Sequence, residues 1–157
     1  MILPEPWVQP GPANNEIWYT SSDGKIVTPY QASSLPTIVS NTYVGGKGVI
    51  KFASDITSIG WSAFAYCNSL TSVMIPNSVT SIGNDAFNRC SSLSSVIIPN
   101  SVTSLGKWTF YYCSGLTSVT IGNSVTIIGD FALTGCNGLT TISYTGTITQ
   151  YNAINKG

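Results

Sequence analysis

The sequence between residues 49 and 145 repeats with a period of 23 residues. The segment SVTSIGNDAFNRCSSLSSVII, residues 78–98, is followed 23 positions later by SVTSLGKWTFYYCSGLTSVTI. The unit reads I-G-x-x-A-F-x-x-C-x-x-L-x-x-V-x-I-P-x-x-V, and all four cysteines of the chain keep this spacing. A unit this short cannot bury its own apolar side, whereas stacked units bury a continuous core. The period therefore predicts a solenoid.

The L-x-x-V-x-I part of each unit has the spacing of a leucine-rich repeat. Val73 and Ile75 lie two positions apart, so a strand directs both inward, and we expect the same of the pairs Val96 with Ile98, Val119 with Ile121, and Ile142 with Tyr144. Proline then ends the strand, because it has no N–H for a ladder. Three further apolar columns are predicted to fill the core: Phe64, Phe87 and Phe110; Cys67, Cys90, Cys113 and Cys136; Leu70, Leu93, Leu116 and Leu139.

A second short extended segment is expected at 79–82 and at its equivalents, and the A-F-x-x-C segment is expected to form one helical turn. The predicted fold is mainly β with short helical turns. It is a right-handed leucine-rich-repeat solenoid of 23-residue repeats with N- and C-terminal caps. Successive strands should be parallel and about 4.8 Å apart.

The predicted organisation has four parts: a proline-rich linker (1–13), a β-rich N-terminal cap (14–48), the leucine-rich-repeat solenoid (49–145) and a C-terminal partial repeat or cap (146–157). In the N-terminal cap, the segment with Ile17 and Tyr19 is expected to form a hairpin with Ile26 and Val27 around Asp23-Gly24. In the C-terminal part, Ile148 and Tyr151 are expected to continue the second extended segment of a fifth unit.

The repeat and the flanking segments NEIWYTSSDGKIV and YTGTITQYNAI resemble the BspA-like, or Treponema-type, leucine-rich repeats of Bacteroides-type surface proteins. The resemblance covers residues 14–155. It implies a bacterial cell-surface or secreted protein, although neither an export signal nor an anchor is visible in this chain. Some members of the family are associated with adhesion to host matrix proteins such as fibronectin and fibrinogen, or with coaggregation between bacteria. The family has no shared catalytic residues.

Composition argues against several classes of function. The formal net charge is zero, and charged residues make up only 8% of the chain, so nothing favours nucleic acid or an anionic membrane surface. No apolar run approaches the roughly 20 residues that span a bilayer. The chain has no histidine, and its six acidic residues are not paired by the sequence. We therefore expect no catalytic residues, no metal site and no cofactor.

The cysteine column favours a structural role. Ligands 23 residues apart form a column along a solenoid and not the tetrahedron that zinc prefers. Stacked Cα atoms about 5 Å apart are compatible with disulfides between coils, but side chains that point the same way give poor dihedral angles. Buried thiols beside phenylalanine are the preferred interpretation, and disulfides between coils remain the alternative.

Two surfaces are candidates for binding. One is an aromatic stripe in the variable columns of the turns, where exposed rings suit a protein or a glycan; stacking across coils, a missing domain or a dimer partner are the structural alternatives. The other is the outward face of the main strands, on which leucine-rich repeats commonly bind partners. The stripe comprises Trp61, Tyr66, Trp108, Tyr111, Tyr112 and Phe131; the strand face comprises Ser72, Met74, Ser95, Ile97, Ser118 and Thr120.

The sequence thus favours a non-enzymatic adhesion or recognition module at the bacterial surface. Its partner would be a host extracellular-matrix protein or a microbial surface protein, with no nucleic acid and no membrane insertion by this segment. One alternative is a carbohydrate-binding accessory module, because aromatic platforms backed by Asn and Asp stack on sugars. A structural spacer is the other.

Overall fold

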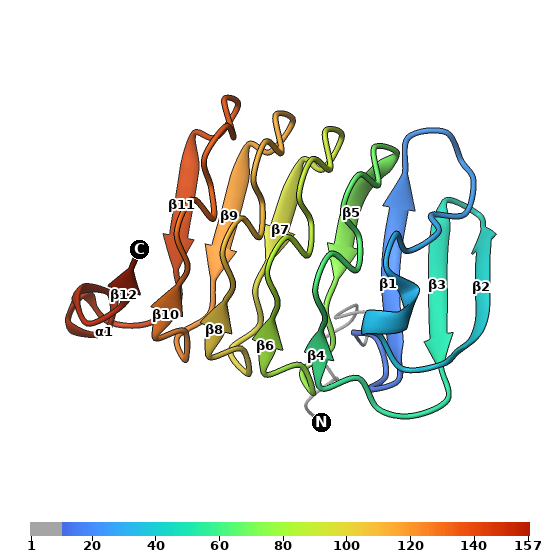
Figure 1. Ribbon diagram of the computed structural model, residues 1–157, viewed down its shortest axis with the longest axis horizontal. Helices are drawn as coiled ribbons and strands as arrows, with labels where there is room; N and C mark the ends of the chain where they lie inside the picture. The colour runs from blue at the N-terminus through green and yellow to red at the C-terminus, as the bar shows by residue number, and fades with distance from the viewer. Residues whose placement is uncertain (1–10) are drawn as a thin grey trace, which may run out of the picture.

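The computed structural model describes residues 11–157, which form a β-solenoid of about four coils. Residues 1–10 of the predicted linker lie outside the described residues. Two sheets run along the solenoid (Figure 1). The first contains, in spatial order, β11 (Thr141–Tyr144), β9 (Ser118–Ile121), β7 (Ser95–Ile97), β5 (Leu70–Met74), β1 (Glu16–Ser21), β3 (Lys47–Phe52) and β2 (Ile38–Val44). The second contains β12 (Asn155–Lys156), β10 (Ile127–Ile128), β8 (Ser104–Leu105), β6 (Ser81–Ile82) and β4 (Ser58–Ile59).

The parallel strands pair in the register of the repeat. Ser72 pairs with Ser95, Ser95 with Ser118 and Ser118 with Thr141, each partner 23 positions further along the chain. The second sheet keeps the same step, since Ile59 pairs with Ile82 and Ile82 with Leu105. The predicted fold class, a mainly β solenoid of 23-residue leucine-rich repeats, is confirmed.

Identical columns of side chains hold the coils together. Phe64, Phe87 and Phe110 are buried and stacked, with ring centroids 5.4 Å apart and planes 6° apart. On the surface, the hydroxyl of Thr103 donates to the carbonyl of Thr80, and Thr126 donates to Thr103 in the same way. A chain with few charges therefore satisfies carbonyls between its coils with threonine hydroxyls.

The segments around A-F-x-x-C are tight turns, and none of them is a regular helical turn. Two positions in each coil have a positive φ, and a left-handed residue interrupts a right-handed helix. The backbone N–H groups bond instead to the next coil, as Phe64 N–H does to the carbonyl of Ala86 at 2.8 Å. The left-handed positions are Ser62, Asp85, Trp108 and Phe131 in one column, and Tyr66, Arg89, Tyr112 and Gly135 in the other.

The N-terminal region joins the main sheet in a way that the sequence did not predict. β1 lies between β3 and β5 and is antiparallel to both, so the predicted hairpin with Ile26 and Val27 is wrong. The turn at Asp23-Gly24 is present, since Lys25 N–H donates to the Asp23 carboxylate. Val27 is buried and its N–H donates to the Tyr19 hydroxyl at 3.1 Å, so this segment packs over the core and does not pair with β1.

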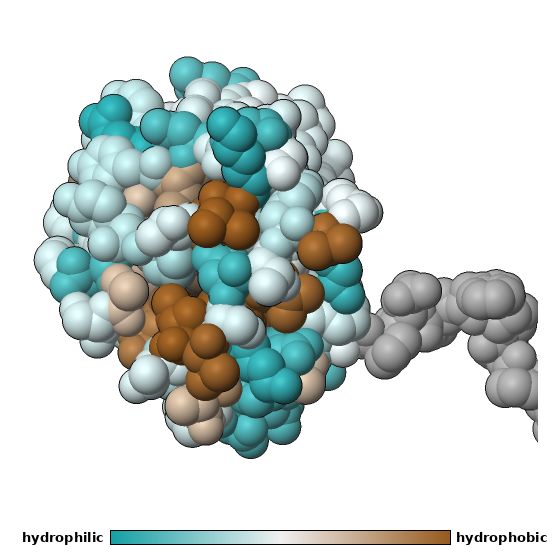
Figure 2. Space-filling view, turned by 90° about the vertical axis from the view of Figure 1, so that its right-hand side faces the viewer, coloured by the Kyte–Doolittle hydropathy of each residue, from teal (hydrophilic) through white to brown (hydrophobic). Residues whose placement is uncertain are grey.

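β2 closes this end of the molecule, and the 3-10 helix η1 (Ala32–Ser34) precedes it in the chain. Figure 2 faces this end, where apolar patches are separated by hydrophilic ones. Its exposed apolar side chains include Ile26, Val39 and Val44.

The C-terminal end departs from the repeat. The helix α1 (Ile148–Asn152) replaces the predicted extended segment and begins with a capping box between Thr147 and Gln150. The chain then returns to the second sheet, where Ile128 pairs with Lys156 and not with Tyr151. Ile142 keeps the inward register of Val119, as predicted, but 49% of it is exposed because no further coil covers it among the described residues.

Candidate functional site

The insertion of β1 builds an apolar row on the outward face of the main sheet. Trp18 of β1 pairs with Met74 of β5, and Met74 pairs with Ile97 of β7. Met74 is 47% exposed and Ile97 is 66% exposed. We call Trp18, Met74 and Ile97 the apolar row. The same register continues through Thr120 of β9 to Ser143 of β11, so the row becomes polar towards the C-terminal end.

Two charged neighbours hold Trp18. Its indole N–H donates to the Glu16 carboxylate at 2.9 Å, and the Lys47 ammonium lies 3.0 Å from the centroid of the ring. These contacts fix the ring beside Met74 at the edge of a shallow hollow.

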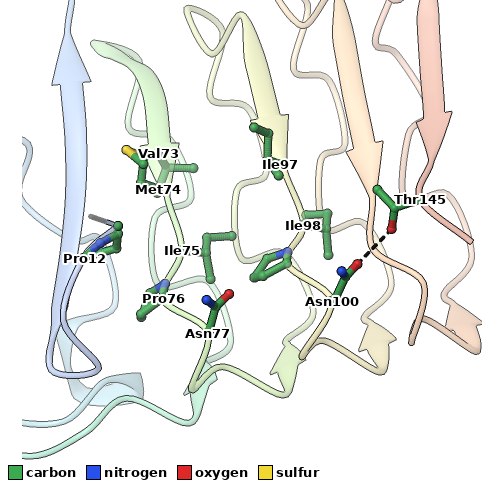
Figure 3. Close-up of a pocket in the computed structure, with 12 residues that line it drawn as sticks. Pro12, Val73, Met74, Ile75, Pro76, Asn77, Ile97, Ile98, Asn100 and Thr145 are labelled. Atoms are coloured by element: carbon green, nitrogen blue, oxygen red, sulfur yellow. Dashed lines mark hydrogen bonds between the residues drawn. The ribbon is translucent and has the colours of Figure 1, made fainter. Parts of the chain in front are cut away.

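A second hollow, of about 360 Å³, lies where β5 and β7 end (Figure 3). Met74 and Ile97 line it together with Asn77 and Asn100, which occupy equivalent positions in neighbouring coils. The Asn100 side-chain oxygen accepts from the Thr145 hydroxyl at 2.8 Å and from the Asn123 N–H at 3.0 Å. The hollow therefore combines an apolar side with two amide groups, of which that of Asn100 is held by hydrogen bonds. Pro12, from the predicted linker, also lines it.

Beside the apolar row runs a row of hydroxyls. Ser72, Ser95 and Ser118 lie side by side on β5, β7 and β9, and Thr20 of β1 extends their row. The Thr20 hydroxyl is 2.6 Å from that of Ser72. The structure thus brings all six predicted strand-face residues onto one neutral surface, and the hydroxyls form its polar margin.

Sequence reasoning missed Trp18 in this surface. The repeat carries no signal for it, because β1 lies outside the repeat and runs against its direction. Local alternation was the available clue: Ile17 and Tyr19 are buried, which directs Trp18 to the opposite face.

The predicted aromatic stripe divides into separate clusters. Trp108 and Phe131 stack with centroids 6.4 Å apart and planes 7° apart, which matches the alternative of stacking across coils. Tyr111 meets Tyr112 edge to face at 4.5 Å. Tyr66 and Trp61 belong to the first coil. The ring centroid of Tyr66 is 5.3 Å from that of Tyr30, and Trp61 is exposed.

The four cysteines are free and buried, which contradicts the alternative of disulfides between coils. The thiols of Cys90, Cys113 and Cys136 each donate to the carbonyl of the phenylalanine one coil earlier, at 3.0 to 3.1 Å. Burial raises the pKa of Cys67 and of Cys136 to about 11. Because the thiolate is the nucleophile, these neutral thiols are unreactive at physiological pH.

Residues 11–157 contain no group of three or more His, Cys, Asp or Glu side chains placed to hold a metal ion. Asp130 forms an ion pair with Lys107 at 2.6 Å. In the same range no helix is both long and apolar enough to cross a membrane.

The predicted leucine column lies in the core, although Leu139 in the last coil is only half-buried.

The fold and its stacked columns define a leucine-rich-repeat protein. The family described as BspA type leucine rich repeat region (6 copies) matches residues 48–154. The chain belongs to this family.

Two solved structures are similar to the chain. A leucine-rich cell surface protein from Faecalibacterium prausnitzii A2-165 is 31% identical, with a TM-score of 0.52, and the match covers 66% of this chain and 34% of that protein. A leucine-rich repeat protein from Bacteroides ovatus ATCC 8483 is also 31% identical, with a TM-score of 0.53, covering 69% of this chain and 32% of that one. The match thus spans about a third of each of these proteins. No curated protein matches the chain.

Proposed function

We propose that this chain is a non-enzymatic protein-recognition module of a bacterial cell-surface or secreted protein. Its partner is a host matrix protein or a microbial surface protein, and its binding surface is centred on the apolar row of Trp18, Met74 and Ile97. One observation carries the proposal: three large apolar side chains lie in register on the outward face of three adjacent strands, with Met74 and Ile97 exposed and Trp18 half-buried. Membership of a leucine-rich-repeat family and similarity to a cell surface protein support it.

The row has the features of a binding centre. Tryptophan is enriched among the residues that dominate binding energy, and such residues lie near the middle of an interface with a polar margin. Here the serine hydroxyls lie on one side of the row, and the amides of Asn77 and Asn100 lie at the ends of the strands. A standard interface buries roughly 800 Å² on each partner, so contacts must extend beyond the row to β9 and to β3. The mechanism is surface complementarity between folded partners.

Binding measured by interferometry tests the proposal. The immobilised samples are fibronectin, fibrinogen and an extract of bacterial surface proteins. We expect saturable binding to at least one of them. Aspartate at the row, in the double variant Met74→Asp with Ile97→Asp, should abolish binding, because a partner would then have to bury two unpaired carboxylates. The matched control is Ser143→Asp, which places a charge in the same row on β11, and it should bind like the unmodified chain.

Two results contradict the proposal. One is the absence of saturable binding by the unmodified chain to every surface. The other is binding that survives in the double variant, whatever Ser143→Asp does. Circular dichroism melting shows whether each variant is folded. Because the substituted side chains are exposed, we expect every variant to fold.

A further inference from the structure

A hollow in the turns is lined by one column of the repeat and is separate from the apolar row. Tyr66, Arg89 and Tyr112 occupy the same position in three successive coils, and the hollow between them is also lined by Asn68, Ser91 and Ser114. Neighbouring coils are about 4.8 Å apart, so the two tyrosines are separated by roughly twice that distance along the solenoid. Arg89 lies between them.

The backbone at these three positions is left-handed, with φ of 59° at Tyr66, 58° at Arg89 and 54° at Tyr112. Few residues other than glycine adopt this conformation, and the fourth coil has Gly135 there. These backbone angles recur at the same position of every coil. Their consequence here is three long side chains presented in one line, since all three are exposed.

Within residues 11–157, Arg89 forms no ion pair. It is the chain's one arginine, and the ion pair found among residues 11–157 joins Lys107 to Asp130 instead. Its guanidinium carbon lies 5.1 Å from the centroid of the Tyr112 ring, a contact that orients the group without using its N–H donors. Arginine presents five such donors in a planar fork that matches a carboxylate.

The aromatic walls are fixed before any ligand arrives. Tyr112 packs edge to face on Tyr111, and Gly135 lies under its ring, because a Cβ at that glycine would come within 2.8 Å of the ring. On the other side, Tyr30 lies 5.3 Å from Tyr66. The Ser91 hydroxyl donates to the Asn68 side-chain oxygen at 3.2 Å, so neutral polar groups line the rest of the hollow.

We propose that this hollow binds a saccharide that carries a carboxylate. The guanidinium of Arg89 binds the carboxylate through two N–H groups. Tyr66 and Tyr112 flank the sugar, and Asn68, Ser91 and Ser114 bond to its hydroxyls. One cation among neutral amide and hydroxyl groups fits a ligand with one acid per unit and many hydroxyls. An acidic peptide, which lacks those hydroxyls, fits the surroundings of Arg89 less well.

Calorimetric titration with trigalacturonic acid, a hyaluronan tetrasaccharide and sialyllactose tests this site. We expect at least one of them to bind with a dissociation constant below about 1 mM. Arg89→Gln should weaken that binding by about tenfold or more, since the charged hydrogen bonds are lost. The matched control is Lys25→Gln, which removes one positive charge from an exposed residue in the N-terminal turn and should leave the affinity unchanged.

Two further arms separate the alternatives. The methyl ester or neutral analogue of the bound saccharide should not bind, whereas the Met74→Asp, Ile97→Asp double variant should bind the saccharide normally, because its substitutions lie outside the hollow. The proposal is overturned if none of the three saccharides binds, if the neutral analogue binds equally well, or if a glutamate oligopeptide binds more tightly than all of them. None of these results depends on whether the apolar row binds a protein.

Discussion

The coil that contains β7 and the coil that contains β11 have the same kinds of interior residue in different surroundings. Val96 of β7 is 2% exposed, whereas Ile142, at the equivalent position in β11, is 49% exposed. Phe87 is buried in a stack of three rings, but its counterpart Leu133 is only half-buried. Burial in this molecule is thus decided by the presence of a neighbouring coil and not by the residue itself.

The same contrast separates structural from functional positions. Interior columns must match from coil to coil, because each side chain packs against its own kind in the next coil. Outward columns are free of this constraint, and they change from Met74 and Ile97 to Thr120 and Ser143 along a single row. The candidate binding surfaces lie where the outward chemistry is least uniform.

The largest expected effect comes from the phenylalanine stack. Phe87→Ala should lower the free energy of unfolding by about 3–5 kcal/mol, because it leaves a cavity between two rings that cannot move together. Phe131→Ala, at an exposed ring of the last coil, should lower it by less than about 1 kcal/mol. Urea unfolding at equilibrium measures both values. Equal losses would contradict the difference in burial between the two rings.

Alkaline pH should produce an intermediate effect through the cysteine column. The pKa of Cys67 and of Cys136 is about 11 in the folded chain, above the ordinary value of 9.0. Below pH 9 the thiols are protonated in both states, so their contribution is complete there. Between pH 9 and 11 the unfolded chain loses these protons while the folded chain keeps them, so the free energy of unfolding should fall.

Urea unfolding at several pH values across this window measures the slope. Burial raises the pKa of Tyr19 as well, so this residue adds to the same trend. The double variant Cys67→Ala with Cys136→Ala should have a smaller slope than the unmodified chain. An unchanged slope in that variant would show that the thiols are not responsible.

The smallest effect is expected at the C-terminal end. Thr147 caps α1, where its hydroxyl accepts from the Gln150 N–H at 3.2 Å. Thr147→Ala should destabilise the helix by about 1 kcal/mol. Amide hydrogen exchange should therefore become faster in α1 and β12 and stay unchanged in β7. Thr149→Ala, within the same helix, is the control, and equal acceleration in both variants would argue against the cap.

Much of the solenoid could be predicted because its constraints are local and repeated. The spacing of Val73 and Ile75 predicted which face of a strand points inward, and the 23-residue step predicted which strand pairs with it. The tight turns were harder, since Ala, Phe and Cys are also compatible with a helix. The left-handed angles at Tyr66 and Arg89 arise from bonds to the next coil, which no single unit specifies.

The candidate surfaces were only partly predictable for the same reason. Met74 and Ile97 follow from the strand register, but Trp18 joins them through antiparallel pairing over more than 50 residues of chain. Arg89 is not aromatic and so was not part of the predicted stripe, although its place in the column between Tyr66 and Tyr112 is visible in the repeat. At the C-terminal end, the five residues of α1 occupy the predicted place of the strand, so the residues that pair with β10 come later in the chain, at β12.

The position of β1 determines the composition of the apolar row, because it places Trp18 beside Met74. Native-state hydrogen exchange of the unmodified chain tests it directly. With partners on both sides, the amides of β1 should exchange as slowly as those of β5 and β7, while the edge strand β2 exchanges faster. If β1 instead exchanged as fast as β2, it would not lie within the sheet, and the apolar row would lose its tryptophan.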